Sequence, residues 1–401
     1  MTPFLQICSI LAILLLAAKT FGYLSTRLGQ PSVLGELIIG VILGPSLLNI
    51  FSVSFLDYVE LPFFVNEFAE LGVLFLMFIA GLELHLSDLA KNKSASAYAG
   101  ILGVLVPIFL GFLVGELFSM DIEHSLFLGL TLGATSVSIS AQTLIELKVL
   151  RSRVGFGLLG AAIFDDMLVI LILSGFIALH QGGSVNEILI VLIKMIIFLG
   201  ASLAIGYWIL PKISRKIHKL PIAQGTITMA IIIMLVYGVS AELLGGMAAI
   251  TGSFIAGLMF ARTAEKNDIE RGLRSLSYGL FVPIFFINIG LHVDIHGMGI
   301  SSIWILLIIT IAAIVGKILG SGLGARLGKF SWMESLQLGI GMVSRGEVGL
   351  IVATVGLNEN LLSAELYSTI VGMVLITTLI TPPLLRASFT KSKNIPSPSQ
   401  F

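Results

Sequence analysis

Long runs of apolar residues recur along the whole chain. Each run holds roughly 17 to 25 mainly apolar residues, enough for an α-helix to cross about 30 Å of hydrocarbon. The sequence therefore predicts an all-α polytopic membrane protein with thirteen transmembrane helices. Their predicted ranges are 4–23, 31–48, 64–84, 97–119, 125–147, 154–178, 187–210, 223–242, 247–262, 276–294, 303–325, 332–356 and 366–386.

The composition agrees with a bilayer environment. Of the 401 residues, 56% are hydrophobic and only 11% are charged, which leaves too little polar surface to cover a soluble globule. The formal net charge is zero, which argues against a nucleic-acid partner. Cys8 is the single cysteine and the six histidines show no HExxH spacing, so we expect no cofactor and no cysteine-based metal site. The first run lacks a basic leader and is predicted to be a retained helix.

The basic residues lie almost wholly in alternate loops. Positive residues in short loops are retained on the cytoplasmic side, so their positions predict the orientation. The N-terminus is predicted outside and the C-terminus in the cytoplasm. The segregated set comprises 19 of the 23 Lys and Arg residues, namely Arg27, Lys91, Lys93, Lys148, Arg151, Arg153, Lys212, Arg215, Lys216, Lys219, Arg262, Lys266, Arg271, Arg274, Arg326, Lys329, Arg386, Lys391 and Lys393.

Four basic residues fall inside predicted spans. Lys19 and Lys194 lie where a long side chain can extend to the headgroups at little cost. Lys317 and Arg345 lie deeper. A charge at the bilayer centre costs roughly 2.5 to 3.5 kcal/mol even on the insertion scale, so these two residues are expected to have a partner or a water-filled cavity.

Two pairs of spans resemble each other in sequence. "LGELIIGVILG" in span 31–48 resembles "ITGSFIAGLMF" in span 247–262, and "FIAGLELHL" in span 64–84 resembles "FINIGLHVDI" in span 276–294. The second member of each pair comes seven spans after the first. Because seven is odd, the copies cross the membrane in opposite directions, as is typical of secondary transporters. We predict inverted repeats over approximately 4–178 and 223–386, a linking span at 187–210 and a short cytoplasmic tail at 387–401.

The same seven-span offset pairs two polar, glycine-interrupted spans. Span 125–147 contains "GATSVSIS" and span 332–356 contains "GMVSRGEVG". Non-helical backbone at membrane depth is tolerated only where it is buried in protein or lines a cavity. We therefore predict two discontinuous helices whose breaks meet near the midplane and offer carbonyl oxygens and helix dipoles to a cation. Close helix packing by small residues is the alternative.

Two adjacent carboxylates, Asp165 and Asp166, lie within "AAIFDDML" in span 154–178, roughly 16 Å along the predicted helix. Consecutive helical residues point about 100° apart, so the two acids cannot share one partner on one face. One acid is expected to meet a protein cation, for which Lys317 is the candidate, and the other to face a wet cavity. Protons and a small cation would then compete for the same carboxylates.

The chain resembles the cation:proton antiporter-2 family, within the sodium/hydrogen exchanger superfamily, and in particular its bacterial two-aspartate sodium/proton antiporters. The resemblance covers essentially the whole chain. It is carried by seven ordered motifs, "LGQPSVLGELIIGVILGPSLL", "LGVLFLMFIAGLEL", "GATSVSISAQTL", "GAAIFDDML", "PIFFINIGLHVD", "GKILG" and "GMVSRGEVGLIVA".

The resemblance implies a single exchanger-type membrane domain over residues 1–401. It also implies a homodimer in a bacterial inner membrane, each protomer having a dimerisation domain and a core domain around two crossed discontinuous helices. No cofactor is implied, and the partners would be the lipid bilayer, protons and monovalent cations. In this family an Asp-Asp pair accompanies electrogenic exchange, so the implied function is an electrogenic sodium or lithium/proton antiporter, not an enzyme.

The resemblance also implies roles for individual residues. Asp166 would be the principal ion and proton carrier, and Asp165 would form a salt bridge with Lys317 that breaks when sodium binds, so that both acids form the Na⁺ site. Thr135 and Ser136 would lie beside the ion at the first break. The residues implied to support the site at the second break are Arg345 and Glu347.

Other functions remain as alternatives. Potassium-efflux relatives usually carry Gln-Asp in place of Asp-Asp, but a potassium/proton antiporter stays possible from the sequence. A transporter-like ion sensor also fits. An intramembrane aspartyl protease would need its two acids on different helices, and a potassium channel would need a filter such as TVGYG, which the sequence lacks.

Overall fold

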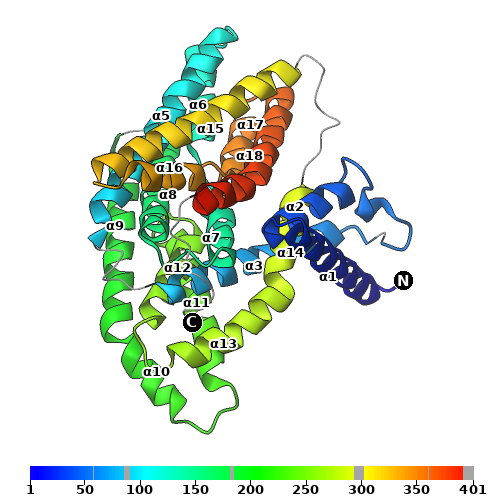
Figure 1. Cartoon of the computed structure of the whole chain (residues 1–401), viewed down its shortest axis with the longest axis vertical. Coiled ribbons are helices and arrows are strands. Elements are labelled where there is room, and N and C mark those ends of the chain that lie inside the picture. Colours follow the sequence, from blue (N-terminus) through cyan, green and yellow to red (C-terminus); the bar gives the residue numbers. More distant parts are fainter. Residues whose placement is uncertain (57, 85–90, 181–184, 293–301, 360, 392–401) are drawn as a thin grey trace. The chain divides into compact units, whose positions relative to one another are not determined.

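The computed structural model describes residues 1–56, 58–84, 91–180, 185–292, 302–359 and 361–391, and the regular secondary structure within these residues is entirely helical (Figure 1). The predicted all-α class is confirmed for this part of the chain. Two compact units are formed. Unit 1 contains Met1–Leu61, Asn92–Asp165 and Phe286–Phe401, and unit 2 contains Pro62–Lys91 and Asp166–Phe285.

Most helices lie within a single unit, either unit 1 or unit 2. The helices of unit 1 are α1 (Pro3–Arg27), α2 (Ser32–Leu43), the short turn η1 (Ile50–Ser52), α5 (Lys93–Leu117), α6 (Ile122–Gly133), α7 (Val137–Glu146), α15 (Ser302–Leu327), α16 (Trp332–Gly341), α17 (Glu347–Asn358) and α18 (Ala364–Lys391). The helices of unit 2 are α3 (Leu61–Glu83), α9 (Val185–Trp208), α10 (Leu210–His218), α11 (Gly225–Leu243), α12 (Ala249–Phe260), α13 (Lys266–Leu276) and the π-helical turn η2 (Ser277–Phe281). The division runs through α8 (Arg153–His180), after Asp165, and through α14 (Val282–Leu291), after Phe285.

The membrane-spanning character predicted from the apolar runs is confirmed. In the described residues, 10 helices or helix pairs are long and apolar enough to cross a bilayer, with mean hydropathy of 1.3 to 2.8. Three predicted spans contain shorter apolar helices instead: α2 in 31–48, α12 in 247–262 and α17 in 332–356. A 12-residue helix such as α2 rises only about 18 Å, so these helices alone are shorter than the hydrocarbon core.

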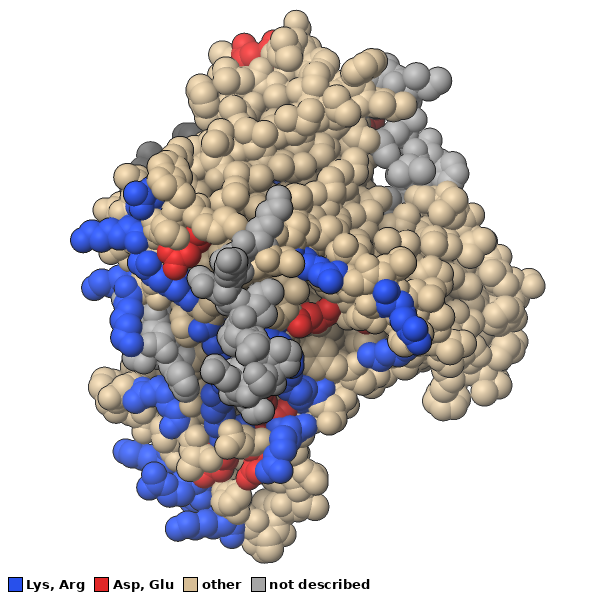
Figure 2. All heavy atoms as spheres, in the orientation of Figure 1, with Lys and Arg blue, Asp and Glu red and all other residues tan. Residues whose placement is uncertain are grey.

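Two segments predicted as loops are amphipathic helices. On α13, Ile269 and Leu273 lie four residues apart and are buried, while the charged residues occupy the other face. On α10, Leu210 and Ser214 are buried, and the Ser214 hydroxyl donates to the Glu265 carboxylate at 2.6 Å. Both helices are too polar to register as apolar runs, so only their four-residue period could have revealed them. Figure 2 shows Lys and Arg side chains gathered on the part of unit 2 that contains these two helices.

A row of glycines brings α15 against α5 within unit 1. A β-carbon added at Gly320 would lie 2.3 Å from the carbonyl oxygen of Leu102, and one at Gly324 would lie 2.2 Å from that of Tyr98. The spacing is four residues, the small-xxx-small pattern that lets membrane helices approach closely. The four glycines of the row are Gly316, Gly320, Gly324 and Gly328.

Glycines also make two equivalent contacts in the two proposed repeats. In unit 1, a β-carbon at Gly40 of α2 would lie 2.2 Å from the Ile287 carbonyl oxygen of α14. In unit 2, a β-carbon at Gly257 of α12 would lie 2.0 Å from the Phe78 carbonyl oxygen of α3. These glycines correspond in the aligned motifs "LGELIIGVILG" and "ITGSFIAGLMF". Each contact thus joins a helix of one predicted repeat to a helix of the other.

We predict that Gly324→Ala lowers thermal stability, because its methyl group collides with the Tyr98 backbone, which cannot rotate away. Overpacking of this kind costs about 1 to 3 kcal/mol or more. The matched control is Gly322→Ala on the same helix, where the nearest atom to an added β-carbon is 3.3 Å away. The half-inactivation temperature of the detergent-solubilised protein is the measurement. Equal temperatures for the two variants would contradict the close α5–α15 packing.

Candidate ion-binding site

The two acids of the "FDD" motif lie next to each other on α8, and both are buried. Asp165 is 0% exposed and Asp166 is 6% exposed. Because successive residues of a helix point about 100° apart, each carboxylate meets different neighbours. The partners of Asp165 lie in unit 1, and a partner of Asp166 lies in unit 2.

Asp165 is ion-paired with Lys317 from α15. The Lys317 ammonium donates to Oδ2 of Asp165, and both side chains are fully buried. The Thr135 hydroxyl donates to the same oxygen at 3.1 Å. Three elements therefore converge on one carboxylate oxygen: α8, α15 and the segment between α6 and α7.

Two glycines on α5 make room for this contact. A β-carbon at Gly100 would lie 2.6 Å from the Ala161 carbonyl oxygen and 3.3 Å from the Asp165 nitrogen, both on α8. A β-carbon at Gly103 would lie 3.7 Å from the Lys317 ammonium nitrogen on α15. Larger residues at these positions would push α8 or α15 away from α5, so the small residues of "YAGILG" help to bring the acid and the lysine together.

The second oxygen of Asp165, Oδ1, is buried and has no hydrogen-bond partner among the described residues. A buried charged oxygen without a partner is costly, since it has lost its hydration without replacement. It is therefore a position at which a small cation, a proton or a water molecule would be stabilised.

The chain breaks at both predicted positions. Helix α6 ends at Gly133 and α7 begins at Val137, while α16 ends at Gly341 and α17 begins at Glu347. The breaks are hydrogen-bonded to each other within unit 1. The Ser136 N–H donates to the Ser344 carbonyl oxygen at 2.9 Å, and the Ser344 hydroxyl donates back to the Ser136 carbonyl oxygen. The polar residues of the two motifs thus satisfy the backbone groups that the breaks leave open.

Arg345 lies at the second break and is fully buried. Its guanidinium donates to the carbonyl oxygen of Ala134 in the first break, to the Thr135 hydroxyl at 3.4 Å and to the Ala313 carbonyl oxygen of α15 at 3.3 Å. Its own carbonyl oxygen accepts the hydroxyl of Thr378. Arg345 therefore ties the two breaks to α15 and α18 and adds positive charge near Asp165.

Asp166 meets α12 within unit 2. The Thr251 hydroxyl donates to its Oδ2 at 3.3 Å. Thr251 is the third residue of α12, so this carboxylate lies at the N-terminal turn, where the helix dipole stabilises negative charge. The sequence reasoning missed Thr251. Thr251 lies within the repeat motif "ITGSFIAGLMF", which marks it as a residue of interest. A lone threonine in an apolar run, however, gives no indication of its partner.

The remaining predicted residues are placed as follows. Lys19 and Lys194 are exposed, in contrast to Lys317 and Arg345. Ser136 is buried at the first break, and its hydroxyl lies 2.9 Å from that of Ser138. Glu347 is the first residue of α17, but its side chain lies outside the described part of the structure. Among the described residues, no three His, Cys, Asp or Glu side chains form a metal-binding group.

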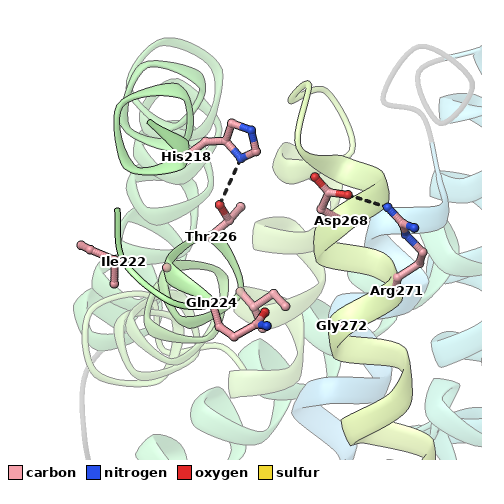
Figure 3. A pocket seen from close by; sticks show the side chains of 9 residues that line it. His218, Ile222, Gln224, Thr226, Asp268, Arg271 and Gly272 are labelled. Atoms are coloured by element: carbon pink, nitrogen blue, oxygen red, sulfur yellow. Dashed lines mark hydrogen bonds and ion pairs between the residues drawn. The ribbon is translucent and has the colours of Figure 1, made fainter. Parts of the chain in front are cut away.

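A separate cavity of about 560 Å³ lies in unit 2 between the end of α10, the start of α11 and α13 (Figure 3). The Asp268 carboxylate and the Arg271 guanidinium form an ion pair at 2.7 Å on one wall, and His218 Nδ1 lies 3.5 Å from the Thr226 hydroxyl on the other. Its lining includes none of the residues predicted to bind ions.

Comparison of the chain with known proteins identifies its family. Residues 11–389 match the family described as "Sodium/hydrogen exchanger, transmembrane". The chain is 41% identical over 379 residues to the probable Na⁺/H⁺ antiporter GerT of Bacillus cereus, covering 94% of this chain and 98% of that protein. It is 38% identical over 379 residues to the Na⁺/H⁺-K⁺ antiporter GerN of the same organism, covering 94% and 95%.

The fold is similar to that of a solved structure. The sodium proton antiporter MjNhaP1 from Methanocaldococcus jannaschii at pH 8 superimposes with a TM-score of 0.68 at 18% identity, over 96% of this chain and 97% of that one. The likeness shows that the chain has the helical fold of that structure. The chain belongs to the sodium/hydrogen exchanger family of cation/proton antiporters, which confirms the family predicted from the sequence.

We predict that Lys317→Gln destabilises the protein more than the double change Asp165→Asn with Lys317→Gln does. The single variant leaves a buried carboxylate without its counter-ion, which costs about 3 to 5 kcal/mol, whereas the double variant buries no charge at this contact. Thermal denaturation in detergent is the measurement, and exposed Lys194→Gln is the control. A double variant as unstable as the sum of the single variants would contradict a direct coupling.

Proposed function

We propose that the chain is an electrogenic antiporter that exchanges Na⁺ or Li⁺ for protons by alternating access. The observation that carries this proposal is the buried acid pair on α8, in which Asp165 is ion-paired with Lys317 and keeps one oxygen without a partner. The chain's similarity to the probable Na⁺/H⁺ antiporter GerT and to the Na⁺/H⁺-K⁺ antiporter GerN supports the proposal.

In this mechanism Asp166 is the principal carrier. An arriving cation is neutralised by Asp166 and by Asp165, which exchanges its Lys317 partner for the ion. Protons compete with the cation for the same oxygens, so a proton that binds from one side displaces the ion to that same side, and the protonated site then becomes accessible to the other side. Carboxylate, hydroxyl and carbonyl oxygens are suited to a hard cation such as Na⁺. The coupling needs no covalent step.

The breaks supply the other oxygens. Thr135 and Ser136 lie at the first break, where Thr135 already contacts Asp165, so a small movement brings its hydroxyl to an ion held by that acid. Arg345 keeps the breaks together, and Glu347 at the start of α17 supports the site. When the ion leaves, Lys317 returns to Asp165 and prevents an empty, doubly negative site. Net charge crosses the membrane because two protons, one on Asp166 and one on Asp165, are exchanged for one cation while Lys317 stays charged.

At the level of the whole chain, we propose thirteen crossings in two inverted repeats, 4–178 and 223–386, with 187–210 linking them and a tail at 387–401. The paired glycine contacts of α2 with α14 and of α3 with α12 support this arrangement. The proposal further includes a homodimer with core and dimerisation domains in a bacterial inner membrane. The N-terminus is outside and the C-terminus cytoplasmic, as the segregation of basic residues indicates.

We expect Asp166→Asn to abolish exchange, because a neutral amide can neither carry a proton nor neutralise Na⁺. Everted vesicles with a trapped pH dye provide the measurement: added Na⁺ dissipates a preformed proton gradient with the parent chain and not with the variant. Asp121→Asn is the control, since Asp121 is an exposed N-cap residue and asparagine caps equally well. A parent chain that binds Na⁺ without dissipating the gradient would favour the ion sensor.

Potassium is the second candidate ion, because GerN is called a Na⁺/H⁺-K⁺ antiporter. The acid pair by itself does not distinguish Na⁺ from K⁺. The choice depends on how closely the oxygens of the breaks can approach the ion.

We predict that the concentration of Na⁺ for half-maximal exchange rises as the pH falls, because protons and Na⁺ compete for the acid pair. Below the pKa that governs binding, it approaches about a tenfold rise per pH unit for one competing proton. Proteoliposome assays with Na⁺, Li⁺ and K⁺ at several pH values, together with currents on a solid-supported membrane, test this competition and the electrogenic step. A half-maximal concentration independent of pH would contradict competition, and larger rates with K⁺ would select the second candidate.

A further inference from the structure

Ser321 on α15 is a buried hydroxyl without a hydrogen bond. Its residue is 0% exposed, and its Oγ has no partner among the described residues. A buried serine in a membrane helix usually donates to the carbonyl oxygen four residues earlier. Several hydroxyls of this chain do so: Thr131, Thr143, Thr377 and Thr381. Ser321 departs from this pattern, so its hydroxyl is available to another group.

The Lys317 ammonium borders the same small space. Ser321 follows Lys317 by one helical turn, and both side chains reach the surface of α5 at Gly103. A β-carbon added at Gly103 would lie 2.2 Å from the Ser321 Oγ and 3.7 Å from the Lys317 Nζ. A side chain at residue 103 would thus collide with the hydroxyl and contact the ammonium.

We infer that Ser321 is a positioning residue that accepts the Lys317 ammonium when a cation displaces it from Asp165. This inference rests on the proposed exchange of Lys317 for Na⁺ at Asp165. An ammonium released into an apolar helix interface loses its charge-assisted hydrogen bond, and a buried charge without a partner is strongly unfavourable. Turning from Asp165 to the Ser321 hydroxyl replaces that bond. Ser321 therefore stabilises the ion-bound state without touching the ion.

Ser321→Ala should raise the KM for Na⁺ about tenfold or more, with kcat within about twofold of the parent value. The lost bond is charge-assisted and is made only in the ion-bound state, so its removal weakens ion binding selectively. Initial rates in proteoliposomes give KM and kcat, and the Na⁺ concentration at half-maximal thermal stabilisation in detergent gives binding without transport. A purely structural role of Ser321 would lower kcat or the midpoint of unfolding and leave this concentration unchanged.

Thr310→Val is the matched control. Thr310 is on the same helix, is 6% exposed and also has a hydroxyl without a partner, but it lies seven residues before Lys317, about two turns away. Its replacement by an isosteric residue should leave the KM for Na⁺ within about twofold of the parent value. An equal rise of KM in Thr310→Val and Ser321→Ala would overturn the inference, because loss of any buried hydroxyl would then suffice.

Gly103→Ala tests the shared space independently. Its methyl group would meet the Ser321 hydroxyl at 2.2 Å, but once Ser321 is alanine the nearest atom of that residue is its β-carbon at 3.4 Å. We expect Gly103→Ala to raise KM as Ser321→Ala does, and the double variant to be no worse than the worse single one, because both remove the same acceptor. Additive effects would overturn the inference.

The outcomes separate the inference from the function on which it rests. If the parent chain exchanges Na⁺ for protons and Ser321→Ala has an unchanged KM, the inference alone is wrong. If the parent chain shows no exchange with any monovalent cation, the proposed function fails and the inference fails with it. A raised KM in Ser321→Ala and Gly103→Ala, with Thr310→Val unchanged and non-additivity in the double variant, establishes the role of Ser321.

Discussion

The contact between Lys317 and Asp165 is the interaction on which the arrangement of unit 1 depends. Two charges without water are tolerated only when they lie close together and their other polar atoms are satisfied. Several features of the fold meet this requirement. Glycines on α5 remove the side chains that would keep α8 and α15 apart, and Thr135 adds a hydrogen bond to the carboxylate. Among the described residues, one oxygen of Asp165 is left without a partner.

The interrupted helices follow from the same constraint. Each interruption exposes backbone N–H and C=O groups at a depth where water is absent, and each such group costs several kcal/mol if it stays unpaired. Here the two interruptions pair with each other through Ser136 and Ser344, and Arg345 covers carbonyl oxygens from two elements. The arginine thus has backbone carbonyl oxygens of Ala134 and Ala313 as partners. Hydroxyl and guanidinium groups can exchange partners by rotation, which a continuous helix cannot do.

Much of this organisation could be predicted from the sequence. Apolar runs locate the long helices, because bilayer thickness fixes their length, and clusters of glycine and polar residues within such runs mark both interruptions. The amphipathic helices α10 and α13 were predicted as loops, since a search for apolar runs overlooks a polar helix with one buried stripe. Contacts between helices could not be predicted from the sequence, for a different reason. The neighbours of Thr251 and Ser321 depend on the rotation and register of packed helices, which one sequence does not specify. The four-residue glycine spacing of α15 was a readable signal that the apolar pattern concealed.

That glycine row has a mechanical consequence. Where the backbone of one helix rests on that of another at four-residue intervals, a shift of α15 along α5 by one, two or three residues would press bulky neighbours such as Ile318 against the carbonyl groups of α5. Only a full step of about 6 Å would restore the fit. Sliding of α15 along α5 is therefore blocked. The two helices must move as one rigid body, and Lys317 moves with them. Any change of accessibility in unit 1 must then take place outside the contact between these two helices.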